Sequence, residues 1–111
     1  QTTFWLVRDC TEIIGESRLR HSLTPKLELE GGHIGYFIVP AERRRGYGTR
    51  ILAFTLDKAR EIGLPRVLVT CDADNIGSRR IIEKNGGMLQ DEVASPESGT
   101  AVLRFWFDLA Q

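Results

Sequence analysis

The sequence predicts an α/β (α+β) fold in which a mixed, mostly antiparallel sheet is flanked by helices. Three observations carry this prediction: apolar and polar residues alternate near the C-terminus, a continuous apolar run lies at residues 66–71, and two helical stretches each end at glycine. The 111 residues suffice for one modest core, and 41% hydrophobic with 27% charged residues is a globular balance. We therefore expect one domain over residues 1–111 with the element order ββ-β-α-β-α-ββ.

The N-terminal third is predicted to consist of strands. Residues 3–8 are rich in aromatic and β-branched side chains, and residues 12–22 follow a short polar turn as a hairpin partner. Residues 23–32 contain a proline and two glycines, which predicts a loop with at most one helical turn. Residues 33–39 predict a third strand, in which Gly35 indicates a bulge or the close approach of another backbone.

Helices and strands are expected to alternate after this point. From residue 47 to residue 62 apolar positions recur at helical spacing, and Gly63 and Pro65 are the expected stop signals. The apolar run at 66–71 is typical of a strand buried on both faces. Three further elements complete the chain: a helix from a cap at Asp74 or Asn75 to about residue 85, a short strand at 88–93 and a final strand at 101–109.

The turn before the first long helix, with the sequence AERRRGYG, indicates an anion-binding site. Gly46 and Gly48 let the backbone turn tightly and come close to a ligand. The first turn of the following helix presents unpaired N–H groups to the same place. Four arginines add positive charge around it: Arg43, Arg44, Arg45 and Arg50. This combination suits a ligand of diphosphate type.

Other phosphate-binding loops do not fit this turn. A P-loop needs a lysine and a different glycine spacing, and a dinucleotide-binding loop needs a third glycine where Ile51 stands. The competing interpretation is a helix start with a solvated basic face. The strand expected before the turn and the helix expected after it favour a binding loop.

Composition excludes several classes of protein. Basic and acidic residues number 15 each, and the arginine turn lacks interleaved stacking aromatics, which argues against nucleic-acid binding. No apolar run approaches the length of a membrane span, and no Cys/His spacing suggests a metal site. Cys10 and Cys71 are expected to be free thiols in a reducing, cytoplasmic compartment.

Two sequence blocks together resemble the acyl-coenzyme A signature of the GNAT acetyltransferase superfamily. The first is Arg43-x-x-Gly46-x-Gly48, and the second is Asn75-x-x-Ser78 followed by the helix end Glu83-Lys84-Asn85-Gly86. The resemblance covers roughly residues 33–93 and is greatest to a bacterial subgroup of predicted acetyltransferases.

This resemblance implies acetyl-coenzyme A (acetyl-CoA) as co-substrate and no metal. It places residues 37–39 beside the pantetheine arm and the acetyl carbonyl, and it directs the backbone N–H groups of residues 44 or 45 through 49 at the pyrophosphate. Asn75 would hydrogen-bond the pantetheine arm, Ser78 would lie near it, and Lys84 with one arginine would meet the adenosine phosphate. The implied cofactor-binding residues are Phe37, Ile38, Val39, Arg43, Arg44, Arg45, Gly46, Tyr47, Gly48, Thr49, Arg50, Asn75, Ser78 and Lys84.

The proton donor of this family has no counterpart here. Many members place a tyrosine general acid where this sequence has Ile82, which cannot donate a proton. Tyr36 and Cys71 are weak substitutes, and core packing explains both residues better. A thiol of pKa near 8.5 is a tolerable leaving group, so the thiolate can depart unaided.

The predicted catalytic residue is His33, as general base. It stands early in its strand, where many relatives carry a glutamate, and its pKa near 6.5 suits the removal of a proton from an amine. The competing interpretation is a hydrogen-bonded strand histidine. Glu28 and Glu30 in the preceding loop are alternative bases, and His21 is a weaker one.

The resemblance therefore implies an enzyme that passes acetyl directly from acetyl-CoA to an amine of a small molecule or a protein. The alternative is a non-catalytic module that binds acetyl-CoA beside an incomplete acceptor site. Family members normally carry a further strand and one or two helices before the segment equivalent to Thr3, so the chain is expected to be N-terminally short.

Two further expectations follow from the resemblance. Four apolar residues would lack a covering partner, which predicts a homodimer or weak stability: Trp5, Val7, Val102 and Trp106. Gly48→Val is expected to abolish coenzyme A binding by blocking the approach of the ligand to the backbone.

Overall fold

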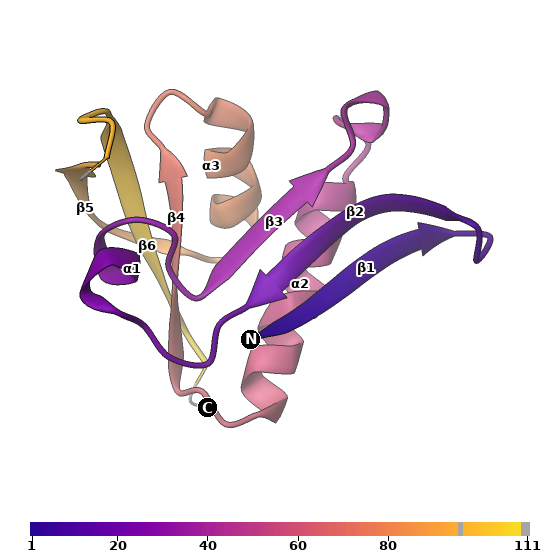
Figure 1. The fold of residues 1–111 in the computed structure, drawn as a ribbon, viewed down its shortest axis with the longest axis horizontal. Coiled ribbons are helices and arrows are strands. Elements are labelled where there is room, and N and C mark those ends of the chain that lie inside the picture. The colour runs from indigo at the N-terminus through magenta and orange to yellow at the C-terminus, as the bar shows by residue number, and fades with distance from the viewer. Residues whose placement is uncertain (96, 110–111) are drawn as a thin grey trace.

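The predicted element order is confirmed by the computed structural model, which describes residues 1–95 and 97–109 (Figure 1). One short helix is added inside the predicted loop at 23–32. The elements are β1 (Thr2–Arg8), β2 (Glu12–Leu19), α1 (Pro25–Leu29), β3 (Ile34–Ile38), a 3₁₀ turn (Pro40–Glu42), α2 (Tyr47–Glu61), β4 (Arg66–Asp72), α3 (Ile76–Lys84), β5 (Met88–Ala94) and β6 (Ala101–Asp108).

The N-terminal strands form an antiparallel sheet in the order β1-β2-β3. The predicted irregularity at Gly35 is wrong, because Gly35 pairs with Arg18 within an unbroken β2–β3 register. The register of this sheet shifts instead opposite the Leu6–Val7 step of β1, where Ile14 of β2 is the extra residue. A Cβ atom at Gly35 would meet no protein atom within 4 Å, so no other part of the described backbone approaches it closely.

The C-terminal strands form a second antiparallel sheet in the order β4-β6-β5. Residues 67–69 of β4 are fully buried, as expected for the apolar run, because the central part of this strand lies inside the core. Its partner β6 alternates buried and partly exposed side chains over most of its length. The final strand predicted from alternation is therefore confirmed as the centre of this sheet.

The two sheets meet where β3 and β4 run side by side in the same direction, and beyond that point the strands diverge (Figure 1). At the closed end the backbone N–H of His33 donates to the carbonyl of Leu68 at 2.7 Å. Further along, the two strands belong to separate hydrogen-bonded sheets. A wedge therefore opens between β3 and β4 toward their carboxyl ends.

Helices α2 and α3 pack on the same face of this layer and contact one another. Leu52 of α2 and Ile82 of α3 are fully buried in one core cluster with Phe105 of β6. The Asn85 side-chain amide, just after α3, donates to the carbonyl of Thr49 at 3.2 Å. The start of α2 is thus held against α3, and both helices border the open end of the wedge.

The predicted uncovered apolar group is corrected by the structure. Trp5 is 65% exposed and Val7 is also exposed. Val102 is 1% exposed, inside the core, and the Trp106 ring lies 3.9 Å from the guanidinium carbon of Arg66. The uncovered apolar surface therefore lies on the β1–β2 hairpin, because β6 is covered by its neighbours.

Candidate functional site

The loop between β3 and α2 enters the left-handed region at Gly46, as expected of a tight turn at a glycine, and also at Arg44, which the sequence did not predict. Arg44 has φ 65° and Gly46 has φ 84°, so the chain enters the left-handed region twice within three residues. Gly46 is the N-cap of α2 and offers no side chain to the helix. No group in the described part of the chain accepts a hydrogen bond from the backbone N–H groups of residues 44 to 49. The loop therefore offers a run of unpaired donors to an anion.

Gly48 serves a purpose that sequence reasoning missed. A Cβ atom here would lie 2.5 Å from Cδ1 of Ile81 on α3, and the residue is buried. Gly46, in contrast, has no protein atom within 4 Å of an added Cβ. Because valine at position 48 would first disturb the α2–α3 contact, Gly48→Val does not isolate ligand approach, and position 46 is the better probe.

The arginines around this loop divide into two kinds. The Arg43 side chain donates through Nε to the carbonyl of Ile38 at 2.9 Å and lies over the Phe37 ring. Arg45 pairs with Glu42 at 3.7 Å. Arg44 and Arg50 are exposed and make no ion pair with any described residue. Their charges are therefore free to meet a ligand.

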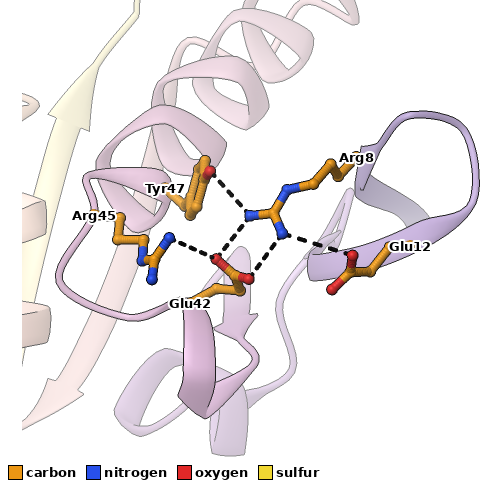
Figure 2. A network of polar contacts seen from close by, with 5 residues as sticks. All are labelled: Arg8, Glu12, Glu42, Arg45 and Tyr47. Carbon is orange, nitrogen blue, oxygen red and sulfur yellow. Dashed lines mark hydrogen bonds and ion pairs between the residues drawn. The ribbon is translucent and has the colours of Figure 1, made fainter.

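Beside the loop lies a polar network that the sequence did not predict (Figure 2). Arg8, at the end of β1, donates to both carboxylate oxygens of Glu42 at 3.0 and 2.8 Å and to the Tyr47 hydroxyl at 3.3 Å. Glu42 is only 8% exposed, and Glu12 lies 3.6 Å from Arg8. The hydrogen bonds from Arg8 hold the pKa of Glu42 below its usual range. The acidic residue within an otherwise basic turn was visible in the sequence, but its partner was not.

The wedge between β3 and β4 contains a cleft of about 300 Å³. Its walls come from β3, β4, the start of α3 and the loop after α1. Lining residues include Arg20, Glu30, Gly35, Tyr36, Thr70, Cys71, Asp72, Asn75 and Ser78. Gly35 leaves its part of the wall without a side chain.

Backbone pairing decides which residues of β3 face this cleft. The carbonyl of His33 accepts from Arg20, just after β2, and the N–H of Val39 donates to Ile14 of β2, so the odd-numbered residues between them also pair with β2. The N–H and C=O groups of residues 34, 36 and 38 therefore point to the β4 side. Of the predicted pantetheine neighbours, Ile38 directs its backbone there, whereas Phe37 is exposed and Val39 pairs with Ile14.

The start of α3 brings two predicted residues to the cleft. Asn75 caps the helix through Oδ1, which accepts from the N–H of Ser78 at 3.1 Å, and its amide nitrogen has no partner among the described residues. The Ser78 hydroxyl lies 2.6 Å from that of Tyr36. Burial raises the pKa of Tyr36. Lys84 is exposed at the last turn of α3 and does not line the cleft.

His33 lies at the closed end of the wedge and is not itself a lining residue of the cleft, although its neighbour Ile34 is. Its Nδ1 accepts a hydrogen bond from the backbone N–H of Leu68 at 2.9 Å, and the residue is buried. The neutral ring has one lone pair available for a proton, and here that pair faces Leu68. Burial lowers the pKa of His33. This geometry suits the competing interpretation, a strand histidine that joins the sheets, better than a general base.

The other candidate bases lie in different places. Glu30 lines the cleft, and its Oε2 accepts a hydrogen bond from Ser95, whose hydroxyl donates at 2.5 Å. Glu28 is exposed and His21 contacts Thr2; neither lines the cleft. The structure therefore brings Glu30 to the cleft.

Ile82, where the resemblance expects a tyrosine, is a core residue. Ile82 is fully buried and contacts the core near Gly87 and Phe107. Tyr36, Thr70 and Ser78 bring hydroxyl groups to the cleft wall, and the Tyr36 hydroxyl is the phenolic one. Cys71 also lines the cleft, where burial raises the pKa of its thiol and so disfavours the thiolate.

Two kinds of feature are absent from the described residues. No group of three or more His, Cys, Asp or Glu side chains is placed to hold a metal ion within residues 1–95 and 97–109. In the same ranges, no helix combines the length and apolar character needed to cross a membrane.

Comparison with known proteins identifies similar sequences and folds. A family model described as the acetyltransferase (GNAT) domain matches residues 1–88. No curated protein is similar enough in sequence to count as a match. The yncA protein of Salmonella typhimurium, solved with its cofactor acetyl-CoA, is 16% identical with a TM-score of 0.75, over 89% of this chain and 60% of that one.

Two further solved structures show the same fold. A GNAT-family acetyltransferase from Bacillus anthracis is 19% identical with a TM-score of 0.77, over 98% of this chain and 67% of that one. A GNAT-family acetyltransferase from Streptococcus pneumoniae is 16% identical with a TM-score of 0.76, over 96% and 65%. The chain spans less than two thirds of the length of the Salmonella and Streptococcus proteins.

Proposed function

This chain belongs to the acetyltransferase (GNAT) domain family, and we propose that it transfers the acetyl group of acetyl-CoA directly to an amine acceptor. The acceptor is a small molecule or a protein amine. Acetyl-CoA supplies an acetyl group activated as a thioester. The solved Salmonella structure of the same fold was determined with acetyl-CoA, which supports this choice of co-substrate.

The observation that carries the proposal is the run of unpaired N–H groups at residues 44–49. A diphosphate is rich in acceptor oxygens, and a helix start with free amides and exposed arginines binds such groups well. The left-handed conformations at Arg44 and Gly46 shape this loop, and an unoccluded Gly46 leaves room for a ligand. The residues present therefore fit the diphosphate of coenzyme A.

The cleft beside the loop fits the remainder of the arm. Pantetheine carries two amides, which need backbone partners. Tyr36 and Ile38 direct backbone groups toward the β4 side, although the carbonyl of Ile38 already accepts from Arg43. Across the cleft the free amide nitrogen of Asn75 offers a further donor. We place the arm between β3 and the start of α3.

Glu30 is the base in this proposal. An amine of pKa near 10.4 must lose a proton before attack, at a cost of about 4.6 kcal/mol at pH 7. The Glu30 carboxylate lines the cleft and uses one oxygen for Ser95. Its other oxygen receives the amine proton, directly or through water. His33 remains in the framework because its lone pair is engaged with Leu68.

Tyr36 is the proton donor to the departing thiolate. Its hydroxyl is held by Ser78 in the cleft wall, and its raised pKa keeps it protonated at neutral pH. The contribution is modest, because a thiol is already a tolerable leaving group. This assignment supplies the hydroxyl that Ile82 lacks.

We also propose a cytoplasmic homodimer. The two cysteines are free thiols, which suits a reducing compartment. Trp5 and Val7 expose apolar surface on the β1–β2 hairpin, which a second copy would cover about a two-fold axis. Sedimentation at micromolar concentration is expected to give twice the chain mass; a well-folded monomer would contradict this.

The proposed function is tested by incubating the protein with acetyl-CoA and a panel of amines. We expect coenzyme A release that depends on one class of amine, measured by thiol titration and by mass spectrometry of the acetylated product. Calorimetry with coenzyme A runs in parallel. Binding without acetylation of any amine would favour the non-catalytic module, and no binding would overturn the proposal.

A further inference from the structure

We propose that Arg8 is a positioning residue for the diphosphate loop, residues 43–46, which it controls through the buried carboxylate of Glu42. The inference rests on the proposed function, since it concerns the loop assigned there to the diphosphate. The side chain of Arg8 makes no hydrogen bond or ion pair with residues 43–46 themselves; its partners are Glu12, Glu42 and Tyr47. It lies on the β1–β2 hairpin, outside both sequence blocks that resemble the family signature.

Arg8 contacts the residue just before the loop and the residue just after it. Glu42, the last residue of the 3₁₀ turn, precedes the loop, and Tyr47, the first residue of α2, follows it. One guanidinium group donates to both residues, at 3.0 and 2.8 Å to Glu42 and 3.3 Å to Tyr47 (Figure 2). The two ends of the loop are therefore tied to a single point on β1.

The loop between these points needs such support. Arg44 is a non-glycine residue in the left-handed region, a conformation that persists only where its surroundings enforce it. Within the described chain, no hydrogen bond from the backbone N–H groups of residues 44–46 holds the loop in place. The bracket formed by Arg8 therefore fixes the spacing of its ends.

Charge gives Arg8 a second effect on the same loop. Glu42 is a nearly buried carboxylate beside amides that would hold an anion. Arg8 occupies both of its oxygens, and Arg45 also approaches it at 3.7 Å. Without Arg8, the carboxylate would compete for Arg45 and for the loop amides and would repel a diphosphate. Arg8 thus keeps the loop positive and its donors open.

The test compares ligands with and without a diphosphate. Coenzyme A carries the group and pantetheine lacks it, so a fault in the loop weakens the first and spares the second. We expect Arg8→Met to raise the Kd for coenzyme A by about tenfold and to leave that for pantetheine unchanged. Both are measured by calorimetry on the full chain. Adding Glu42→Gln to Arg8→Met is expected to restore much of the affinity, because it removes the unpaired charge.

Arg60→Met is the matched control. Arg60 pairs with Asp57 at 2.8 Å near the C-terminal end of α2. Its loss therefore also removes one positive charge and leaves one carboxylate without its ion-pair partner. Its coenzyme A affinity is expected to match the wild type. If Arg8→Met does not fold, Arg8→Lys serves instead, because it keeps the charge but loses the bidentate hydrogen bond to Glu42. We then expect a severalfold loss of coenzyme A affinity with unchanged pantetheine affinity.

The outcomes separate this inference from the proposed function. Wild-type protein that binds coenzyme A no better than pantetheine lacks a diphosphate site, which overturns both. Wild-type protein that discriminates, with an Arg8→Met variant of unchanged coenzyme A affinity, overturns the inference alone. Equal weakening of both ligands also overturns it, since the defect would then not lie in the loop.

Discussion

The backbone polar groups are hydrogen-bonded at the start of strand β3 and, within the described chain, unpaired just beyond its end. At its start, His33 exchanges two hydrogen bonds with Leu68, one through the backbone and one through the ring. At its end, the chain enters a loop whose N–H groups at 44–49 find no acceptor among the described residues. Proteins satisfy most buried polar groups internally, so unpaired donors lie where water or a ligand reaches them. The closed end is framework, and the open end is available for binding.

The largest effect is expected from the cleft carboxylate near the closed end. Glu30→Gln should lower kcat by about 10²–10³, because the amide cannot take the amine proton. Ser95 can still donate to the amide oxygen, so the fold should persist. Steady-state kinetics measure the change, and Glu28→Gln, exposed and outside the cleft, is the matched control. A Glu30→Gln enzyme of normal kcat would return attention to His33.

The open end is tested at Gly46. Gly46→Val should weaken coenzyme A binding by about a hundredfold, because a β-branched residue is strained at φ 84° and its side chain enters the free space beside the amides. Calorimetry measures the affinity. Gly63→Val is the control, since Gly63 has φ 89° and equally open surroundings at the other end of α2. Equal loss in both variants would mean that helix strain, not ligand approach, is responsible.

Tyr36 lies in the cleft wall, between the closed and open ends of the wedge, and its proposed role as proton donor can be tested by mutation. Tyr36→Phe should lower kcat by about tenfold or less and leave the KM for acetyl-CoA near its normal value, because the thiolate can leave without help. Rates with wild-type and variant protein over a range of pH give the comparison. A loss beyond a hundredfold would assign Tyr36 a larger part than proton donation to a good leaving group.

The smallest effect is expected at His33 and concerns stability. Its pKa is lowered in the folded protein from 6.5, so the unfolded chain binds the proton first as pH falls. The stability contributed by neutral His33 is therefore complete above pH 6.5 and declines as pH falls from there through the lower folded pKa. His33→Gln should remove that part of the acid limb in thermal unfolding while its amide oxygen still accepts from Leu68.

The kinetics of His33→Gln also test whether the closed end of the wedge takes part in catalysis. His33→Gln should keep the pH dependence of kcat, because the ring lone pair does not face the cleft. If kcat of a stable His33→Gln protein no longer rose with pH, His33 would be the base and not only a residue that joins the two sheets.

Local sequence determined most of the architecture and, within the site, the diphosphate loop and the start of α3. The strands and helices follow from alternation and helical spacing, and their order is confirmed. The left-handed Gly46, the Asn75 cap and the free amides at the start of α2 depend on neighbours within a few residues. Such features are legible in a sequence because short-range geometry and hydrogen bonding decide them.

Tertiary structure alone decided the roles of residues whose partners are distant in the chain. Arg8 meets Glu42, Gly48 meets Ile81, and the His33 ring meets the Leu68 amide only after the sheets and helices pack. A polar side chain has the same chemistry in any register, but whether its lone pair or charge is already engaged depends on which strand lies beside it. For that reason the sequence could nominate both His33 and Glu30, and only the packed wedge between β3 and β4 could separate them.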